Sequence, residues 1–381
     1  MRLTDLLADA ELRRTTFPVT GHLAYLAHAA VAPLPAAVAG AVATLATRAS
    51  TEGQFEYLTG TAEAEVRRLA AGMLSVTPEE IALVPSTSAG LAMVAAGLDW
   101  RAGDNVLVEE HDFPANVYPW LALRRLGVEV RFVAAGSEPL HADRIVSYVD
   151  GRTRLVTLSS THYLSGRPVI DLCGLGRWLR QRDVLLCVDA IQTLGAQSLC
   201  GRHVDFLAAD GHKWLLAPKG MGLLLVRDHV LSRLRPVLTG WRSVPDPRDL
   251  RLQAGLASSA RRYEPGSVNE LGLVGLHAAL SLLTEVGLET VGKRIGELRQ
   301  RLVSGLRQRD ARLVGEPDRD DWGGIVSFTL PGEVAEVTEG RLRRAGVVVS
   351  RRQQALGGEV VRAAPHFYTS EGDIDRLLDV L

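Results

Sequence analysis

Residues 184–226 read VLLCVDAIQTLGAQSLCGRHVDFLAADGHKWLLAPKGMGLLLV, and this stretch decides the fold. It contains three short, mostly apolar runs, at Val184–Val188, Asp205–Ala208 and Leu223–Val226. Within them apolar residues follow one another instead of alternating with polar ones, which is typical of strands buried on both faces by helices. The last two runs are close together in the chain. Because a parallel connection needs a longer crossover, we predict that one strand here is antiparallel.

The same pattern continues on the N-terminal side of this stretch. Three further strand-like runs precede it, at Asn105–Val108, Val128–Val133 and Arg154–Leu158. Helical patterns such as Ile170–Arg182 lie between the runs. Strands that alternate with helices predict an α/β fold with a mostly parallel sheet.

Beyond about Glu270 the pattern changes to longer helical spacing and fewer strands. The patterns of this part are a helical stretch over residues 273–303 with a break at Gly287, strand-like runs at Ile325–Leu330 and Val347–Val349, and a closing helix over residues 370–381. We therefore predict a large α/β domain over residues 21–270 and a smaller α+β domain over residues 271–381. Residues 1–20 are predicted to pack with the smaller domain.

The composition limits the classes of partner. The chain has 43 Lys+Arg and 44 Asp+Glu, and its formal net charge of -1 creates no field that favours nucleic acid or an anionic membrane. Its three cysteines, Cys173, Cys187 and Cys200, are too few and too unevenly spaced for a disulfide framework or a metal site. We see no apolar stretch near the roughly 20 residues of a membrane span and no apolar core of a secretory signal. We therefore expect a cytoplasmic protein that binds neither nucleic acid nor a membrane.

Polar residues gather where the predicted strands end, at residues 109–113, 159–163, 189–192 and 210–213. In an open α/β sheet, ligands bind outside the carboxyl ends of the strands, so these residues predict a ligand crevice. Lys213 lies there in the segment Asp-Gly-His-Lys-Trp. A lysine can form a Schiff base where desolvation or neighbouring charge lowers its pKa, although an isolated lysine is more often a surface charge.

Two other features of the crevice each allow two interpretations. Asp189 could be the N-cap of the next helix, or it could pair with a protonated ring nitrogen that makes a pyridine ring an electron sink. Gln192 could reach a ring hydroxyl from the same turn. The hydroxyls and free N–H groups of Pro85–Gly90, which opens a helix to about Ala96, could cap that helix or bind a phosphate. The Gly-rich fingerprint of a nucleotide-binding fold is missing here.

Motifs that run in order along nearly the whole chain resemble those of a known family. The most informative are VDAIQTLGAQ at 188–197, VDFLAADGHKWL at 204–215 and PKGMGLLLV at 218–226. Others are LAHAA at 26–30, DFPAN at 112–116, GWRSV at 240–244, YEPGSVN at 263–269 and VRAAPHFY at 361–368. Together they resemble the aminotransferase class V family, which also contains the cysteine desulfurases. The resemblance implies fold type I of the pyridoxal 5'-phosphate (PLP) enzymes, with a seven-stranded sheet.

The resemblance implies how PLP would be held. Lys213 would carry it as a Schiff base, Asp189 would pair with the pyridine nitrogen, and Gln192 would contact the ring hydroxyl. The phosphate would be bound by Thr87, Ser88 and His212. Phe113 matches the ring-stacking position, where many desulfurases have histidine, and His111 is the competitor if the alignment shifts. Either ring could stack, but only His111 could also move protons.

Contacts with substrate and with a second subunit are also implied. The family is usually a homodimer with sites at the subunit boundary, so Gly266 and Ser267 would reach the phosphate of the neighbouring subunit. Arg362 matches the arginine that binds the carboxylate of an amino-acid substrate, and a guanidinium suits that planar group. His28 and Trp241 match substrate-side positions.

The sequence departs from the desulfurase pattern at two places. Desulfurases carry a nucleophilic cysteine on a loop before the carboxylate-binding arginine, whereas residues 349–358 read VSRRQQALGG, so we expect no persulfide chemistry. Arg351 and Arg352 occupy this loop, either as a solvated basic turn or as contacts to a bulky or acidic substrate. Tyr163 stands where many relatives have asparagine, which leaves Gln192 as the main partner of the ring hydroxyl.

The resemblance leaves open which reaction follows loss of the α-proton. The motifs at 240–241 and 365–368 resemble the desulfurase, lyase and epimerase branch more than the plain transaminases. We therefore predict a lyase that eliminates a group such as a thiolate from Cβ of a β-substituted or cysteine-conjugate amino acid. An aminotransferase or an epimerase is the alternative. A catalytically inactive scaffold is a third possibility, but a scaffold needs none of Lys213, Asp189, Gln192 or Arg362.

Overall fold

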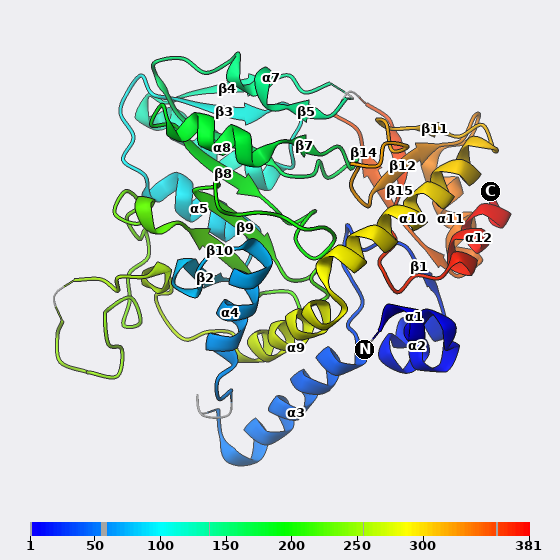
Figure 1. The fold of residues 1–381 in the computed structure, drawn as a ribbon, viewed down its shortest axis with the longest axis horizontal. Helices are drawn as coiled ribbons and strands as arrows, with labels where there is room; N and C mark the ends of the chain where they lie inside the picture. The colour runs from blue at the N-terminus through cyan, green and yellow to red at the C-terminus, as the bar shows by residue number, and fades with distance from the viewer. Residues whose placement is uncertain (1, 55–58, 137, 254, 356) are drawn as a thin grey trace.

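A seven-stranded sheet forms the centre of the larger part of the molecule (Figure 1). The structure is a computed structural model that describes residues 2–54, 59–136, 138–253, 255–355 and 357–381. In spatial order the strands are β2 (Ile81–Val84), β10 (Gly222–Val226), β9 (Phe206–Asp210), β8 (Leu185–Asp189), β6 (Thr153–Ser159), β3 (Asn105–Glu109) and β4 (Glu129–Val133). All pairs are parallel except those of β10, which is antiparallel to β2 and β9. The predicted α/β fold with a mostly parallel seven-stranded sheet is confirmed.

The central strands are buried on both faces, as their apolar runs predict. Every residue of β3, β8, β9 and β10 is buried. Successive side chains point to opposite faces, so Leu186 and Val188 join one hydrophobic cluster, whereas Leu185 and Cys187 join the other. The helices that cover the two faces are α4 (Ala62–Leu74), α8 (Leu172–Arg180) and α9 (Glu270–Val286) on the first, and α5 (Thr87–Gly97) and α6 (Tyr118–Leu121) on the second.

Two local features differ from the predicted pattern. Strand β2 was not predicted, because a run of four apolar residues is too short to distinguish a strand from the start of a helix. The helix predicted over residues 170–182 begins later, at Leu172. Asp171 takes a left-handed conformation before it, with φ 55°, and its side chain caps the helix by accepting the Gly174 N–H.

A four-stranded antiparallel sheet forms the C-terminal part. Its strands, in order, are β11 (Arg312–Leu313), β12 (Val326–Thr329), β15 (Glu359–Ala363) and β14 (Ser350–Gln353). A third hydrophobic cluster joins this sheet to α10 (Leu288–Arg307), α11 (Ala335–Arg344) and α12 (Glu371–Val380). Beside this sheet, β1 (Ala24–Tyr25) pairs in parallel with β13 (Val347–Val348). Residues from near the start of the chain therefore belong to the C-terminal part.

Helices α9 and α10 connect the two sheets (Figure 1). Gly287, with φ 88°, separates them, and their axes bend by 80°. Apolar side chains of α9 join the large cluster, whereas Leu298 and Leu302 of α10 join the C-terminal one. The packing therefore places α9 against the large sheet, although the domain boundary predicted at residue 270 assigns it to the smaller domain. Within the described ranges no single helix is long and apolar enough to cross a membrane. Among the described helices only α9 and α10 taken together reach that length and composition, and they are bent at Gly287.

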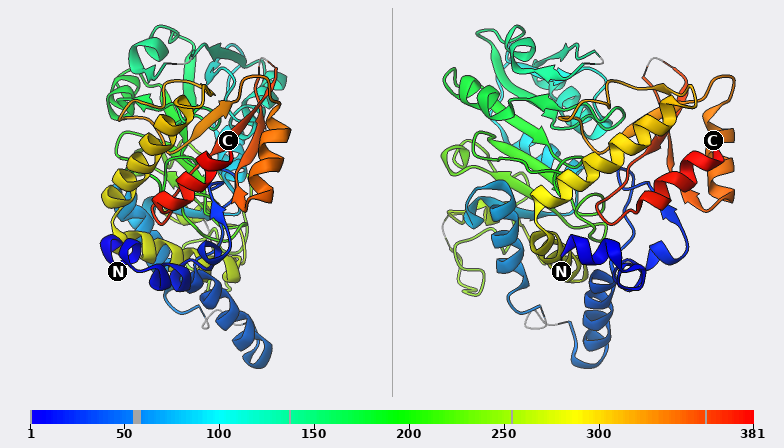
Figure 2. Two further views of the ribbon diagram at one scale, coloured as in Figure 1. Left: turned by 90° about the vertical axis from the view of Figure 1, so that its right-hand side faces the viewer. Right: turned by 45° about the vertical axis from the view of Figure 1, so that its right-hand side comes forward.

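The first residues lie beside the end of the chain. Helices α1 (Leu3–Ala8) and α2 (Ala10–Thr16) lead to Phe17, whose ring stacks on Tyr368 at 3.9 Å between centroids, and Arg13 pairs with Asp373 at 3.1 Å. Helix α3 (Ala36–Glu52) packs on α9 and extends away from the body (Figure 2). Two other short strands are β5 (Leu140–His141) and β7 (Val169–Ile170), and α7 (Ala142–Val146) is a short helix.

Candidate active site at the strand ends

The carboxyl ends of β3, β6, β8 and β9 open onto one cavity of about 230 Å³. The loops after these strands supply much of its wall, and the start of α5 and the strands β14 and β15 add to it. The lining residues are Ala29, Ala30, Ser86, Thr87, Ser88, Phe113, Ala115, Tyr163, Asp189, Ile191, Gln192, Asp210, His212, Lys213, Arg352 and Arg362. The cavity thus lies where an open α/β sheet binds ligands, and it brings charged groups of both signs together.

Lys213 and Asp189 form the polar centre of the cavity. Lys213 follows β9 and is 9% exposed, and its Nζ lies 5.5 Å from the centre of the Phe113 ring. Burial lowers the pKa of its ammonium group, and the charge of Asp189 opposes that shift. Burial raises the pKa of the Asp189 carboxyl, whose Oδ1 accepts the Ile191 N–H at 3.0 Å. A buried lysine that loses its proton readily is the nucleophile that a Schiff base requires.

The start of α5 forms part of the cavity wall. Ser86 caps the helix, because its Oγ accepts the Ala89 N–H at 3.1 Å. Thr87 Oγ1 accepts the Asp210 N–H at 2.8 Å, which ties the helix start to the end of β9. The structure shows the capping role for Ser86, while Thr87 and Ser88 line the cavity at the positive end of the helix dipole, a position that suits an anion. His212 lines it beside them.

Gln192 is held by two protein groups. Its amide nitrogen donates to the Ala29 carbonyl at 3.0 Å, and its oxygen accepts the Trp214 indole N–H at 2.8 Å. A glutamine amide has two N–H donors and two acceptor lone pairs, so one of each is left for a ligand. The orientation of the amide is therefore fixed before any ligand binds.

Phe113 lines the cavity, and its ring packs edge-on against Tyr163 at 5.3 Å between centroids. The buried Asp112 carboxylate holds this loop by accepting the Phe113 N–H at 2.7 Å, the Ser159 hydroxyl at 2.6 Å and the Asn116 amide at 2.8 Å. His111 is absent from the described lining: it has φ 64° and half of its side chain is exposed near Glu110. Position therefore favours Phe113 as the stacking ring. This role of Asp112 was not predicted from the sequence.

Arg362 enters the cavity from β15. It is 2% exposed, its Nε donates to Ser350 Oγ at 3.2 Å, and its Nη1 donates to the Tyr163 carbonyl at 2.5 Å. Its Nη2 is buried without a hydrogen-bond partner among the residues that the structure describes. Burial and the charge of Arg352 lower the pKa of the guanidinium. A buried unpartnered donor is costly, so Nη2 is the atom that an anionic ligand would satisfy.

Four other predicted residues lie away from the described lining of the cavity. Trp241 is 52% exposed, and Gly266 and Ser267 lie in the loop before α9. His28 is fully buried beneath the cavity. Its Nδ1 lies 2.8 Å from the Ala364 carbonyl and its Nε2 lies 2.6 Å from the Tyr368 hydroxyl. Both ring nitrogens are therefore occupied, and His28 packs the core where a substrate contact was expected.

The side chains of the cavity fit PLP. Lys213 supplies an amine for its aldehyde, Asp189 a carboxylate for its ring nitrogen, and Phe113 an aromatic face for the ring. Its phosphate matches the start of α5. His212 Nδ1 lies 3.1 Å from Asp210 Oδ1. Arg362 Nη2 is buried without a hydrogen-bond partner among the residues that the structure describes, so the cavity also holds a polar atom that a ligand would satisfy.

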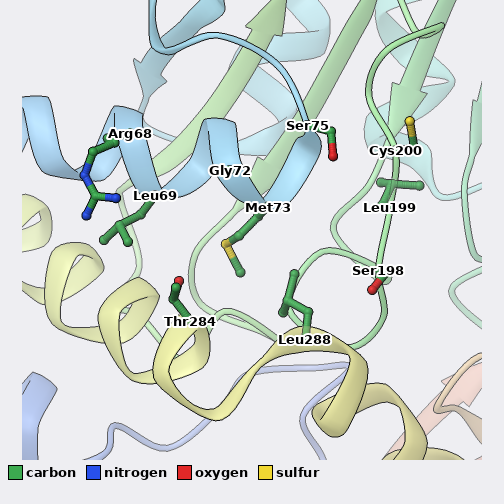
Figure 3. Close-up of a pocket in the computed structure, with 10 residues that line it drawn as sticks. All are labelled: Arg68, Leu69, Gly72, Met73, Ser75, Ser198, Leu199, Cys200, Thr284 and Leu288. Atoms are coloured by element: carbon green, nitrogen blue, oxygen red, sulfur yellow. The ribbon is translucent and has the colours of Figure 1, made fainter.

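A larger hollow, of about 530 Å³, lies elsewhere, between α4, residues 198–200 and the junction of α9 and α10 (Figure 3). Met73, Thr284 and Leu288 point into it from the helices. Arg68 is the charged residue among those that line this hollow, and it already pairs with Glu65 at 2.7 Å. Charged groups do not converge there as they do around Lys213, so size alone does not identify the site.

Comparisons with known proteins give one family. The family described as aminotransferase class-V matches residues 24–377. A probable cysteine desulfurase of Methanothermobacter thermautotrophicus is 31% identical over 333 residues, which are 83% of this chain and 82% of that protein. The structure of an apo cysteine desulfurase from Thermococcus onnurineus NA1 has a TM-score of 0.88 at 24% identity, covering 97% of this chain and 96% of that one, and shares the fold. A C-DES variant with glycine covalently linked to its PLP cofactor has a TM-score of 0.87 at 26% identity, covering 96% and 98%. Another structure holds C-DES, a cystine C-S lyase, with its product cysteine persulfide.

Proposed function

The chain belongs to the aminotransferase class V family, whose members use PLP, and on this premise we propose that it is a lyase that removes a group from Cβ of an amino acid. The observation that carries the proposal is a buried lysine, Lys213, that shares one cavity with Asp189, the start of α5 and Arg362. The favoured substrates are β-substituted amino acids in which a C–S bond breaks, such as cysteine conjugates.

Each side chain of the cavity has a task in this reaction. PLP, when bound, supplies an electron sink that stabilises negative charge at the α-carbon. Lys213 would hold it through Nζ and would move the proton at Cα, which its lowered pKa favours. Arg362 would bind the α-carboxylate through Nη2. In the net reaction the Cβ–S bond breaks and sulfur leaves with the electron pair. Water is consumed, and a 2-keto acid, ammonia and a thiol are formed.

The positions of the cysteines support a lyase over a persulfide-forming desulfurase. Residues 349–358 contain no cysteine, and no cysteine is among the described residues that line the cavity. Cys187 is buried within β8, and Cys200 lines the hollow of Figure 3. Burial raises the pKa of Cys173, which neighbours Cys200, to about 11, so its thiol is a poor nucleophile at neutral pH. C-DES, a cystine C-S lyase with the same fold, is a relative with the proposed chemistry.

A homodimer is part of the proposal. Large apolar side chains are exposed on the segment between β10 and α9, which projects from the body in Figure 1: Val237 (50%), Leu238 (57%), Trp241 (52%), Leu250 (90%) and Leu252 (105%). Exposed large apolar side chains gathered on one segment are expected at a protein interface. A second copy of the chain would cover it and would bring Gly266 and Ser267 to the neighbouring cavity. Sedimentation should give twice 41.2 kDa, whereas a monomer at micromolar concentration would contradict this assembly.

The lyase is tested by mixing PLP-loaded protein with S-substituted cysteines. Equal release of keto acid, ammonia and thiol, together with an absorbance band that the Lys213→Ala variant lacks, would support it. Keto acid formed with transfer of the amino group to an added keto acid would identify an aminotransferase. Exchange of the α-proton with racemisation would identify an epimerase. No PLP band would make the chain a scaffold, and each of these three results would overturn the lyase.

A further inference from the structure

Arg351 and Arg352 are neighbours in sequence but face opposite sides of β14. The sequence left open whether this basic pair meets solvent or substrate. In the structure β14 pairs with β15 so that Ser350 is opposite Arg362 and Arg351 is opposite Val361. Side chains alternate along a strand, and directly opposed residues share a face. Arg352 is therefore on the face of Ser350 and Arg362, and Arg351 is on the other face.

The contacts of the two arginines follow this alternation. Arg351 Nη1 pairs with Glu359 at 2.8 Å and lies 3.9 Å from Glu336, so its charge is neutralised outside the cavity. Arg352 is half-buried and lines the cavity together with Arg362 and Tyr163. Its Nη1 donates to the Arg351 carbonyl at 2.7 Å, which holds the side chain in place. Only one of the two arginines can therefore meet a substrate.

The cavity thus contains two guanidinium groups without an anion. Within the described ranges of the chain, Arg352 and Arg362 donate to carbonyl and hydroxyl oxygens and form no ion pair with a carboxylate. The acidic lining residues, Asp189 and Asp210, lie at the strand ends, on the side of Lys213 and His212. Two like charges close together in a partly buried site repel each other unless a ligand brings negative charge. One α-carboxylate would compensate Arg362 alone.

We propose that Arg352 binds a second acidic group of the substrate, so that the preferred substrate is an amino acid with an anion on the side chain beyond Cβ. This substrate class rests on the proposed function, in which Arg362 takes the α-carboxylate. In a cysteine conjugate the second acid would lie on the departing thiol. Arg352 is then a specificity residue that acts on binding, while the step at Cα and Cβ is left to Lys213.

The test compares two substrates that differ in one charge: S-carboxymethylcysteine and its neutral amide, S-carbamoylmethylcysteine. Both would release a thiol from the same Cβ. For the wild-type holoenzyme we expect kcat/KM to favour the acid by on the order of 10-fold, mainly through KM, as for a hydrogen bond to a charged group. Arg352→Gln should lose this preference and still cleave the amide, which shows that the variant is folded. Arg351→Gln is the matched control and should keep the preference.

A binding measurement separates the substrate class from the reaction. The same two compounds are titrated against PLP-loaded Lys213→Ala, with and without Arg352→Gln. Preferential binding of the acid that depends on Arg352, without thiol release by the wild type, would support the substrate class and overturn the lyase. Cleavage of both compounds without preference would leave the lyase standing and overturn the role of Arg352. Equal effects of Arg351→Gln and Arg352→Gln would also overturn it.

Discussion

The two walls of the cavity differ in how their polar groups are partnered. On the strand-end wall, defined by Thr87, Asp189, Gln192 and Lys213, most polar side chains are tied to the protein: Thr87 to Asp210, Asp189 to Ile191, and Gln192 to Ala29 and Trp214. On the C-terminal wall, defined by Arg352 and Arg362, hydrogen bonds to the Arg351 carbonyl, to Ser350 and to the Tyr163 carbonyl hold the side chains in place. The two guanidinium groups nevertheless face the cavity with no carboxylate partner among the described residues, and Arg362 Nη2 has no hydrogen-bond partner there.

The difference indicates which ligand each wall serves. Preorganised groups suit a cofactor that stays in one position through every turnover, because no side chain has to be ordered again. Donors that stay unsatisfied suit a substrate that enters and leaves, since its charge relieves their repulsion each time. Variants of the strand-end wall should therefore change the chemical step, and variants of the C-terminal wall should change the choice of substrate.

Loss of Lys213 should have the largest effect. Lys213→Ala removes the group proposed to hold PLP and to move the α-proton, so we expect turnover to fall by on the order of 10⁴-fold or more. Thiol release and the absorbance spectrum are measured together. Lys219→Ala, an exposed lysine nearby in sequence, is the control and should keep both. If the Lys213 variant kept its turnover, the strand-end wall would not be the site of the chemistry.

Asp189→Asn comes next. An amide cannot hold a proton on the cofactor ring nitrogen, so the electron sink weakens and we expect kcat to fall by about 10²-fold to 10³-fold with little change in KM. Bound PLP, measured after release by denaturation, should stay near one per chain because Lys213 and the start of α5 remain. An unchanged kcat would mean that Asp189 serves only as the cap that accepts the Ile191 N–H.

Arg362→Lys tests the role of the C-terminal wall in substrate binding. Lysine keeps the charge but cannot bind a carboxylate in a bidentate manner, and it cannot also reach both Ser350 and the Tyr163 carbonyl. We expect kcat/KM to fall by about 10²-fold, mostly through KM, while the PLP spectrum stays as in the wild type. A fall confined to kcat would contradict the assignment of this wall to substrate binding.

The two walls also differ in how far the sequence predicts them. A residue at the carboxyl end of a buried strand can be placed by counting from an apolar run, and Asp189 and Lys213 both follow such runs. Arg351 and Arg352 were predicted to lie on a loop, whereas they belong to the strand β14 at Ser350–Gln353. Which arginine faces the cavity depends on the register between β14 and β15, a non-local property that a polar run does not encode.

The direction of the His28 side chain likewise could not be predicted from the local sequence. The motif at residues 26–30 was expected to place it near substrate, and its neighbours Ala29 and Ala30 do line the cavity. The histidine itself points into the core, where Ala364 and Tyr368 occupy both ring nitrogens. A motif match predicts where the backbone passes, but the direction of one side chain depends on residues more than 300 positions away in sequence.

The last expected effect is on stability and not on turnover, and it concerns the core beneath the two walls, where His366 Nε2 lies 3.0 Å from the Trp214 carbonyl and so joins them. Burial lowers the pKa of His366 from its usual 6.5 to about 4, so the folded chain keeps it neutral while the unfolded chain takes up a proton. The free energy of unfolding should therefore fall as the pH drops from about 6.5 towards 4, by up to ~1.4 kcal/mol per pH unit for this residue. Urea unfolding across this range should give a shallower slope for His366→Gln than for the wild type. The exposed His22→Gln control should not change the slope, and equal slopes for all three proteins would mean that this histidine is not held neutral between the walls.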